Sequence, residues 1–236
     1  MNSFSASLDS ARVRRVGSFS ELVTTPFAEG VNALCWERSL PGDFGEVVER
    51  LGTGDGITAL DETRLRGLSL SAAGKVAVEV MLEDLRVLRE RGLLPELNCI
   101  REYPRDEESA GVPIDVYSFH ADSATVPTDT WLCTYHGAAS EGLANDEARR
   151  RVDDPAARAE LLRLFGGEPG AAFDEFVKEN CHDLHYVALP HARPFSFGVG
   201  NLWRIAVDYP GSPVPPCIHR APATLPSDPP RLLLIS

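Results

Sequence analysis

The sequence predicts an α+β fold whose C-terminal part is a double-stranded β-helix, also called a jelly roll. Short apolar stretches recur through residues 96–236, and proline and glycine crowd the links between them. Short strands separated by turn residues suit a jelly roll better than a parallel sheet with crossover helices. Helical periodicity is strongest within residues 1–95 and returns in an insert at about 145–180. We therefore expect helices packed outside a strand-rich core.

Bulk properties favour a single domain and exclude several classes of partner. A chain of 236 residues fits one domain. The net charge of −12 argues against a nucleic-acid surface, which needs a basic stripe. No apolar run approaches the length of a membrane span, and residues 1–16 lack the apolar centre of a secretory signal. Five scattered cysteines without a Cys-x-x-Cys pair indicate reduced thiols, so we expect a cytoplasmic protein.

Two helices are predicted in the N-terminal part. Asp43, with Glu46 three residues later, has the pattern of a capping box, and apolar residues at helical spacing follow as far as Gly52. The strongest helical pattern covers residues 71–91, where apolar side chains form one face and Glu and Arg fill the other. Gly92 stands where a C-cap belongs. We expect this helix to pack on the outside of a sheet.

The predicted strands are short, apolar and flanked by turn residues. They cover residues 31–36, 97–103, 113–120, 130–136, 185–189, 202–207, 217–219 and 231–235. The insert is predicted to hold a polar, alanine-rich helix over residues 145–165 and a second short helix that ends near residue 180. Residues 1–18 are predicted to be loose.

Three side chains have the character of metal ligands. His120 and Asp122 follow the predicted strand 113–120, and strand side chains alternate, so the two point to the same side. His219, near the C-terminus, can supply a third ligand. Two histidines and one carboxylate leave three metal positions open, as in non-haem Fe(II) oxygenases, whereas a structural zinc site wants four protein ligands. The simpler alternative is a strand-end histidine hydrogen-bonded to a nearby carboxylate.

An arginine near the C-terminus is suited to binding a carboxylate. Arg231 follows His219 by twelve residues and begins the apolar strand 231–235. A guanidinium can hold a carboxylate through two parallel hydrogen bonds. Arg220 adjoins His219, so on a regular strand it faces away from the metal. We therefore prefer Arg231 for this role.

The pattern His-x-Asp, a long gap, His and then Arg resembles the Fe(II)/2-oxoglutarate-dependent dioxygenase superfamily. The resemblance implies a jelly-roll core and iron held by His120, Asp122 and His219. It implies that Arg231 binds the distal carboxylate of 2-oxoglutarate.

The same resemblance suggests two further points. Prolyl-hydroxylase-like members often use a tyrosine on the next strand to bind 2-oxoglutarate, a role that Tyr135, with Thr134, can match; a core aromatic is the alternative. Related halogenases usually replace the metal-binding carboxylate by a small residue. Asp122 therefore implies hydroxylation, or another oxidation without halide.

Most of the chain also resembles an uncharacterised bacterial family. The likeness rests on Val-Asn-Ala-Leu-Cys-Trp-Glu-Arg at 31–38, Leu-Cys-Thr-Tyr-His-Gly at 132–137, Ser-Glu-Gly-Leu-Ala-Asn at 140–145, Gly-Asn-Leu-Trp at 200–203 and His-Arg-Ala-Pro at 219–222. That family supplies no substrate.

Substrate contacts are expected from strands that flank the metal motif. The candidates are Arg101, Tyr103, Tyr117, Trp203 and Arg204. Either Arg101 or Arg204 would suit a carboxylate or phosphate. A second metal site at Cys181, His182 and His185 is a weaker hypothesis, since histidines near a helix C-terminus are also explained by the helix dipole.

The leading hypothesis is an Fe(II)/2-oxoglutarate-dependent oxygenase that oxidises a small molecule with O2. One alternative is a non-catalytic, metal-binding or sensing jelly roll with the same three ligands. Another is a cupin-like oxygenase that binds its substrate directly to iron and does not use 2-oxoglutarate.

Overall fold

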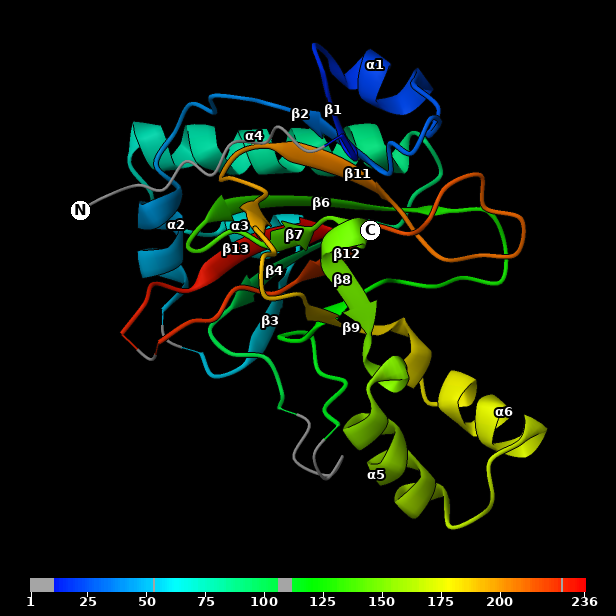
Figure 1. Ribbon diagram of the computed structural model, residues 1–236. Helices are drawn as coiled ribbons and strands as arrows, with labels where there is room; N and C mark the ends of the chain where they lie inside the picture. Colours follow the sequence, from blue (N-terminus) through cyan, green and yellow to red (C-terminus); the bar gives the residue numbers. More distant parts are fainter. Residues whose placement is uncertain (1–10, 53, 106–111, 226) are drawn as a thin grey trace.

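The protein has an α+β architecture in which two curled, mainly antiparallel β-sheets are flanked by helices (Figure 1). The computed structural model describes residues 11–52, 54–105, 112–225 and 227–236. Within these ranges no helix combines the length and apolar character needed to cross a membrane.

The larger sheet has seven strands in the described part of the chain. In spatial order they are β1 (Val13–Val16), β2 (Ala33–Trp36), β11 (Leu202–Ala206), β6 (Asp129–His136), β13 (Arg231–Ile235), β4 (Glu96–Ile100) and β3 (Ile57–Leu60). Only the β1–β2 pair is parallel among them.

The smaller sheet has six strands, all antiparallel, over the same ranges. Their order is β10 (Phe195–Ser196), β7 (Glu141–Leu143), β12 (Ile218–Arg220), β5 (Phe119–His120), β9 (His185–Ala188) and β8 (Ala148–Arg150). Strands from residues 119–150 therefore alternate in this sheet with strands from residues 185–220.

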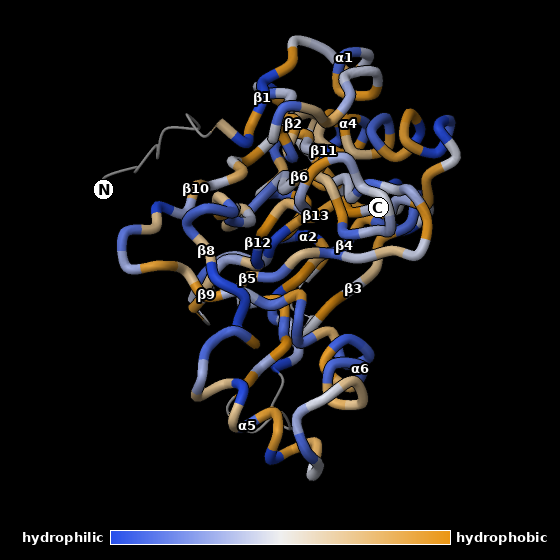
Figure 2. Tube along the Cα trace, turned by 45° about the vertical axis from the view of Figure 1, so that its right-hand side comes forward, coloured by the Kyte–Doolittle hydropathy of each residue, from blue (hydrophilic) through white to orange (hydrophobic). Residues whose placement is uncertain are grey.

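The helices fall into two groups (Figure 1). The N-terminal group comprises α1 (Phe19–Thr24), α2 (Phe44–Leu51), α3 (Glu62–Arg66) and α4 (Ala72–Arg89). The insert contains α5 (Pro155–Phe165) and α6 (Ala171–Glu179), with 3-10 turns at Asn145–Glu147, Arg151–Asp153 and His182–Leu184. Figures 1 and 2 both place α5 and α6 at one end of the molecule, away from the larger sheet.

Alternation along β6 divides the core into two layers. Trp131, Cys133 and Tyr135 join the cluster between the larger sheet and the N-terminal helices, together with residues such as Met81 of α4. Leu132 points the other way, into the cluster that also contains side chains of the smaller sheet. Period-two alternation thus gives this strand one face toward the helices and one toward the space between the sheets.

The caps predicted for the first of the two main helices are confirmed. The Asp43 side chain accepts a hydrogen bond from the Glu46 amide at 2.9 Å, and α2 ends at Gly52 with a φ of 79°. The Ser71 side chain caps α4. The C-cap predicted at Gly92 for the second helix is wrong, because α4 ends at Arg89 with Glu90 as its C-cap and Gly92 follows with a φ of 79°. Glu46 does not complete the capping box, because its carboxylate accepts from the Ser71 amide and hydroxyl instead. It therefore ties the start of α4 to α2.

Several element predictions were wrong. The strand predicted at 113–120 contains only β5, because an Asx turn precedes it: Asp115 accepts from the Tyr117 amide and the Ser118 amide. The helix predicted over 145–165 begins only at Pro155, where the Asp154 side chain caps it. The strand β1 lies in the stretch predicted to be loose, and residues 1–10 of that stretch are outside the described residues.

Candidate metal centre

The structure brings the three predicted ligands together. His120 ends β5 and His219 lies in β12, and the two are paired directly across the antiparallel ladder with ring centroids 4.6 Å apart. Asp122 follows β5, and its two carboxylate oxygens lie 4.0 Å from His120 Nε2 and 3.7 Å from His219 Nε2. One ligand atom from each residue falls within 4.8 Å of the others, and no second such group occurs among the described residues.

Backbone carbonyls orient both imidazoles. His120 Nδ1 lies 2.8 Å from the carbonyl oxygen of Ser118, and His219 Nδ1 lies 3.3 Å from that of Cys217. A carbonyl at Nδ1 favours the tautomer with its proton there, which leaves the lone pair of Nε2 directed at the site. Both histidines are therefore held ready to bind a metal through Nε2.

The protonation states also suit a metal. Burial, followed by the neighbouring His219, lowers the pKa of His120 to about 4. Burial by itself raises the pKa of Asp122, but His219, the Thr130 hydroxyl and His120 together bring it below its ordinary value. Neutral imidazole and ionised carboxylate are the forms that bind metals. At neutral pH, therefore, His120 and Asp122 require no proton release before a metal binds.

A threonine fixes the carboxylate. Thr130 Oγ1, from β6 of the larger sheet, donates to Asp122 Oδ2 at 2.5 Å. The Asp122 side chain is one-third exposed, more than either histidine, so without this bond it is the freest of the three ligands. Oδ2 is the accepting oxygen, and none of the described residues donates to Oδ1.

We predict that Thr130→Val weakens Fe(II) binding about 10- to 100-fold, the usual effect of losing an outer-shell partner. Valine keeps the shape of the side chain but cannot donate to Asp122. Anaerobic competition with a chromophoric chelator measures the affinity. Thr130→Ser retains the donor and should bind like the wild type, whereas equal affinity in Thr130→Val would show that the hydrogen bond is irrelevant to the metal.

Arg231 is buried among polar but uncharged side chains of the described residues. It is 2% exposed, and its guanidinium donates to Tyr103 Oη and Ser140 Oγ at 3.0 Å and to Thr134 Oγ1 at 3.4 Å. Its Nε has no partner, and none of the described carboxylates forms an ion pair with it. Burial lowers the pKa of Arg231. A buried charge surrounded only by neutral groups is costly unless an anion joins it.

Arg231 and the histidines share the space between the sheets. The Ser140 hydroxyl accepts a hydrogen bond from Arg231, and the Ser140 backbone carbonyl accepts one from the Phe197 amide. The Phe197 ring stacks near His219, with centroids 6.4 Å apart. His219 in turn is paired with Gly142 of β7, two residues after Ser140. A short chain of contacts thus joins the guanidinium to the candidate ligands.

A glycine allows the aromatic layer beside His219. A Cβ on Gly142 would lie 2.3 Å from Phe195 Cζ and 2.7 Å from the Phe197 ring, closer than real contacts allow. The Phe197 ring stacks on Phe195 and on Trp203, and the Phe195 and Trp203 rings meet at a tilt with centroids 6.2 Å apart. This layer forms an apolar wall on the side of the site that faces the larger sheet.

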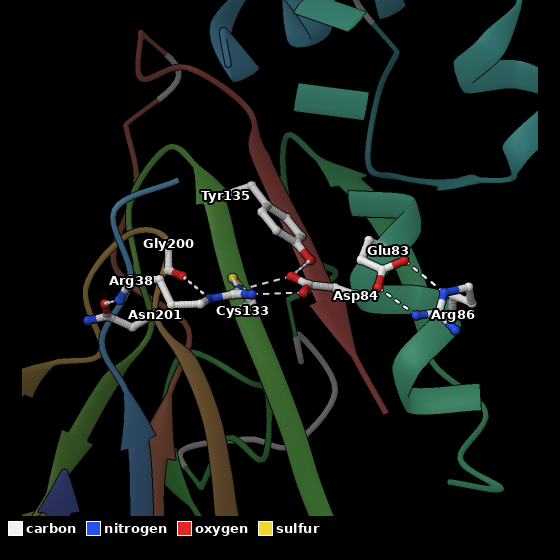
Figure 3. Close-up of polar contacts among 8 residues, drawn as sticks. All are labelled: Arg38, Glu83, Asp84, Arg86, Cys133, Tyr135, Gly200 and Asn201. Carbon is white, nitrogen blue, oxygen red and sulfur yellow. Dashed lines mark hydrogen bonds and ion pairs between the residues drawn. The ribbon is translucent and has the colours of Figure 1, made fainter. Parts of the chain in front are cut away.

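Tyr135 lies outside the site. Its side chain is on the helix-facing side of β6, and its hydroxyl donates to Asp84 Oδ2 of α4 at 2.7 Å (Figure 3). Thr134, its neighbour on the strand, points the other way and accepts from Arg231. Thr134 therefore lies beside Arg231, whereas Tyr135 is a core aromatic that contacts α4.

Two of the predicted substrate contacts are structural. Arg204 points outward, where it pairs with Asp129 at 2.7 Å and donates to backbone carbonyls that include that of Val23. Trp203 is 1% exposed, stacks on Phe197 at 4.3 Å and donates its indole N–H to the Phe197 carbonyl. Arg204 is therefore not available to a substrate, and Trp203 supports the aromatic layer.

The other three candidates lie together. Tyr103 accepts from Arg231, and Tyr117 meets the ring of Tyr103 edge-on with centroids 5.8 Å apart. Arg101 and Tyr117 line one cavity. Arg220, as predicted, faces away from the metal ligands and pairs with Glu141 at 2.7 Å.

The second metal hypothesis finds no geometric support within the described ranges. Cys181, His182 and His185 form no cluster there. His185 instead lies beside the first site: it is paired with His120 across the β5–β9 ladder, their ring centroids are 5.7 Å apart, and its Nδ1 is 2.7 Å from Ser118 Oγ. Burial, then His120, lowers the pKa of His185 to about 3.

The supporting residues Ser118, Thr130 and Ser140 were not foreseen, because only strand pairing brings them to the site. Comparison of the chain with protein-family models, curated proteins and solved structures finds no match.

Proposed function

We propose that the protein is an Fe(II)/2-oxoglutarate-dependent oxygenase that hydroxylates or otherwise oxidises a small molecule. The observation that carries the proposal is the pairing of a His–Asp–His cluster with a buried guanidinium that forms no ion pair with any described carboxylate. Two imidazoles and one carboxylate fit Fe(II), and leave room for a bidentate co-substrate and O2. Arg231 fits the distal carboxylate of 2-oxoglutarate.

The strand order supports a jelly-roll core for this function. Taken along the chain, β4, β5, β6, β7, β10, β11, β12 and β13 give eight strands. The larger sheet contains the neighbours β11-β6-β13-β4, and the smaller sheet contains β10-β7-β12-β5. Such an interleaved order agrees with two Greek keys wound into two facing sheets. The metal ligands then come from the second and seventh strands and Arg231 from the eighth.

Each residue has a defined task in this proposal. His120, Asp122 and His219 would hold the metal, which when bound supplies O2 activation coupled to decarboxylation of 2-oxoglutarate. Arg231 donates its N–H groups to the far carboxylate and gains the counter-charge that it lacks, with the Ser140 hydroxyl beside it. The layer of Phe195, Phe197 and Trp203 keeps water from this side, which strengthens the charge pairing. Orientation of the substrate C–H bond is then the remaining requirement.

The test is spectroscopic and needs no substrate. Fe(II) and 2-oxoglutarate are added without air, and the expected result is the weak visible charge-transfer band of the chelate. In Arg231→Gln the dissociation constant for 2-oxoglutarate should rise roughly 30- to 5,000-fold, since loss of one member of a buried charge pair costs about 2–5 kcal/mol.

Two other results would redirect the assignment. Metal binding without the band would leave a metal-binding or sensing protein. Substrate oxidation that does not respond to 2-oxoglutarate or to Arg231→Gln would indicate an oxygenase of the cupin-like type.

A further inference from the structure

A small cavity lies beside the two segments that carry the histidine ligands. Its volume is about 140 Å³, and its lining consists of Arg101, Glu102, Arg105, Tyr117, Thr224 and Leu225. The segment before His120 and the segment after His219 run side by side here, because the Ala221 amide donates to the Val116 carbonyl at 2.7 Å. The cavity is therefore lined by the segments that precede β5 and follow β12, together with the segment that follows β4.

Two guanidinium groups of this cavity form no ion pair with the carboxylates that the structure describes. Arg101 Nε is buried without a hydrogen-bond partner, and neither Arg101 nor Arg105 forms an ion pair with a described carboxylate. Glu102 shares the lining but forms no ion pair with either of them. The chain as a whole carries a net charge of −12, so its general field repels anions. Two guanidiniums without a described ion-pair partner give this cavity a local positive charge that opposes the general field.

Aromatic contacts hold Arg105 and connect the cavity to Arg231. The Arg105 guanidinium lies 3.6 Å from the centre of the Tyr117 ring, and a cation at this distance is attracted to the ring face. The Tyr117 hydroxyl accepts from the Tyr103 amide at 3.2 Å, and the Tyr103 hydroxyl accepts from Arg231. Tyr103 thus separates the cavity from the proposed 2-oxoglutarate carboxylate site.

The cavity is also within reach of the metal ligands. Tyr117 precedes His120 by three residues, and three residues span at most about 11 Å between Cα atoms. A molecule held in the cavity by one end can therefore place a carbon atom several bonds away near the metal centre. The tyrosine and leucine of the lining offer an apolar wall for the atoms between the two ends.

We propose that this cavity, the Arg101–Arg105 pocket, binds the oxyanion of the substrate. The substrate class is a small anionic molecule, a phosphate monoester or a carboxylate, whose reacting carbon lies within about 10 Å of its anionic group. The guanidiniums of Arg101 and Arg105 bind the oxyanion, and the Thr224 hydroxyl offers a further donor. This inference rests on the proposed function, because it names the substrate of that oxygenase.

The experiment uses the full metal-free chain and two simple probes, inorganic phosphate and acetate, titrated by calorimetry or by NMR. The wild type is expected to bind at least one of them, and the double variant Arg101→Gln/Arg105→Gln to bind it at least about tenfold more weakly, as loss of charge-assisted hydrogen bonds requires. Arg89→Gln/Arg91→Gln is the matched control, since it removes the same charge from exposed arginines. Tighter binding of phosphate would indicate that the substrate is a phosphate monoester, and tighter binding of acetate would indicate that it is a carboxylate.

The proposed pocket would be contradicted if the wild type bound neither probe, or if both double variants lost affinity for the probe equally. The outcome is separable from that of the proposed function. His120→Ala should bind the probe as the wild type does, because the pocket needs no metal. A chain that binds the probe but forms no 2-oxoglutarate chelate would support the pocket and contradict the oxygenase assignment. A chain that forms the chelate but does not bind the probe would support the oxygenase assignment and contradict the pocket.

Discussion

Asp122→Ala is expected to abolish iron-dependent decarboxylation of 2-oxoglutarate and to weaken Fe(II) binding by more than about 100-fold, because even loss of an outer-shell partner costs about 10- to 100-fold. The substitution removes the only carboxylate of the cluster and leaves two imidazoles, which carry no charge to offset that of the metal. His120→Ala should have the same effect. Succinate formation measured by NMR and metal content after gel filtration report the two properties.

The control for this prediction is His191→Ala, which removes an exposed histidine outside the cluster. It should bind iron and turn over 2-oxoglutarate as the wild type does. Retained turnover in both Asp122→Ala and His120→Ala would remove the metal assignment altogether, whatever the behaviour of Arg231.

Asp84→Ala is expected to lower the free energy of unfolding by about 3–5 kcal/mol. Asp84 lies on the buried face of α4, where both carboxylate oxygens accept from Arg38 at 2.7 and 2.9 Å and the Tyr135 hydroxyl donates at 2.7 Å (Figure 3). Each side chain of the ion pair is only 8% exposed, so the substitution leaves the Arg38 charge buried without its partner. For a chain of this length the melting temperature should fall by roughly 6–20 °C, measured by circular dichroism.

The neighbouring residue supplies the control. Glu83 pairs with Arg86 on the exposed face of the same helix (Figure 3), and surface ion pairs contribute little. Glu83→Ala should leave the melting temperature nearly unchanged. The double variant Arg38→Met/Asp84→Leu should recover most of the loss, since replacing a whole buried ion pair by apolar groups is often neutral. A loss as large as that of Asp84→Ala would contradict the unpaired-charge explanation.

The cap at Asp43 and the spacing of two of the candidate ligands were predictable because short-range chemistry determines them. The cap at Asp43 follows from a side chain that binds an amide within one turn. The spacing of His120 and Asp122 follows from the alternation of an extended chain. The same alternation shows that Thr134 and Tyr135, as neighbours on β6, cannot both face the site, so the error over Tyr135 was avoidable.

Other features depend on partners that lie far away in the sequence. The strand β1 pairs in parallel with β2, and β3 pairs with β4 at the opposite edge of the sheet. Short edge strands like these carry little pattern of their own, since pairing and packing decide them. In the sequence, Thr130 and Ser140 are likewise ordinary polar residues. They contact Asp122 and Arg231 only because the fold brings distant strands together. No local signal identifies them.

The direct pairing of β5 with β12 has a thermodynamic consequence. His120 and His219 are 99 residues apart in the sequence, so an ion held by both would act as a cross-link that closes a long loop, much as a disulfide does. Any ligand that binds only the folded chain raises its stability by mass action. The melting temperature of the protein would then rise with the free concentration of the ion. Thermal unfolding would therefore report the fraction of the site that is occupied.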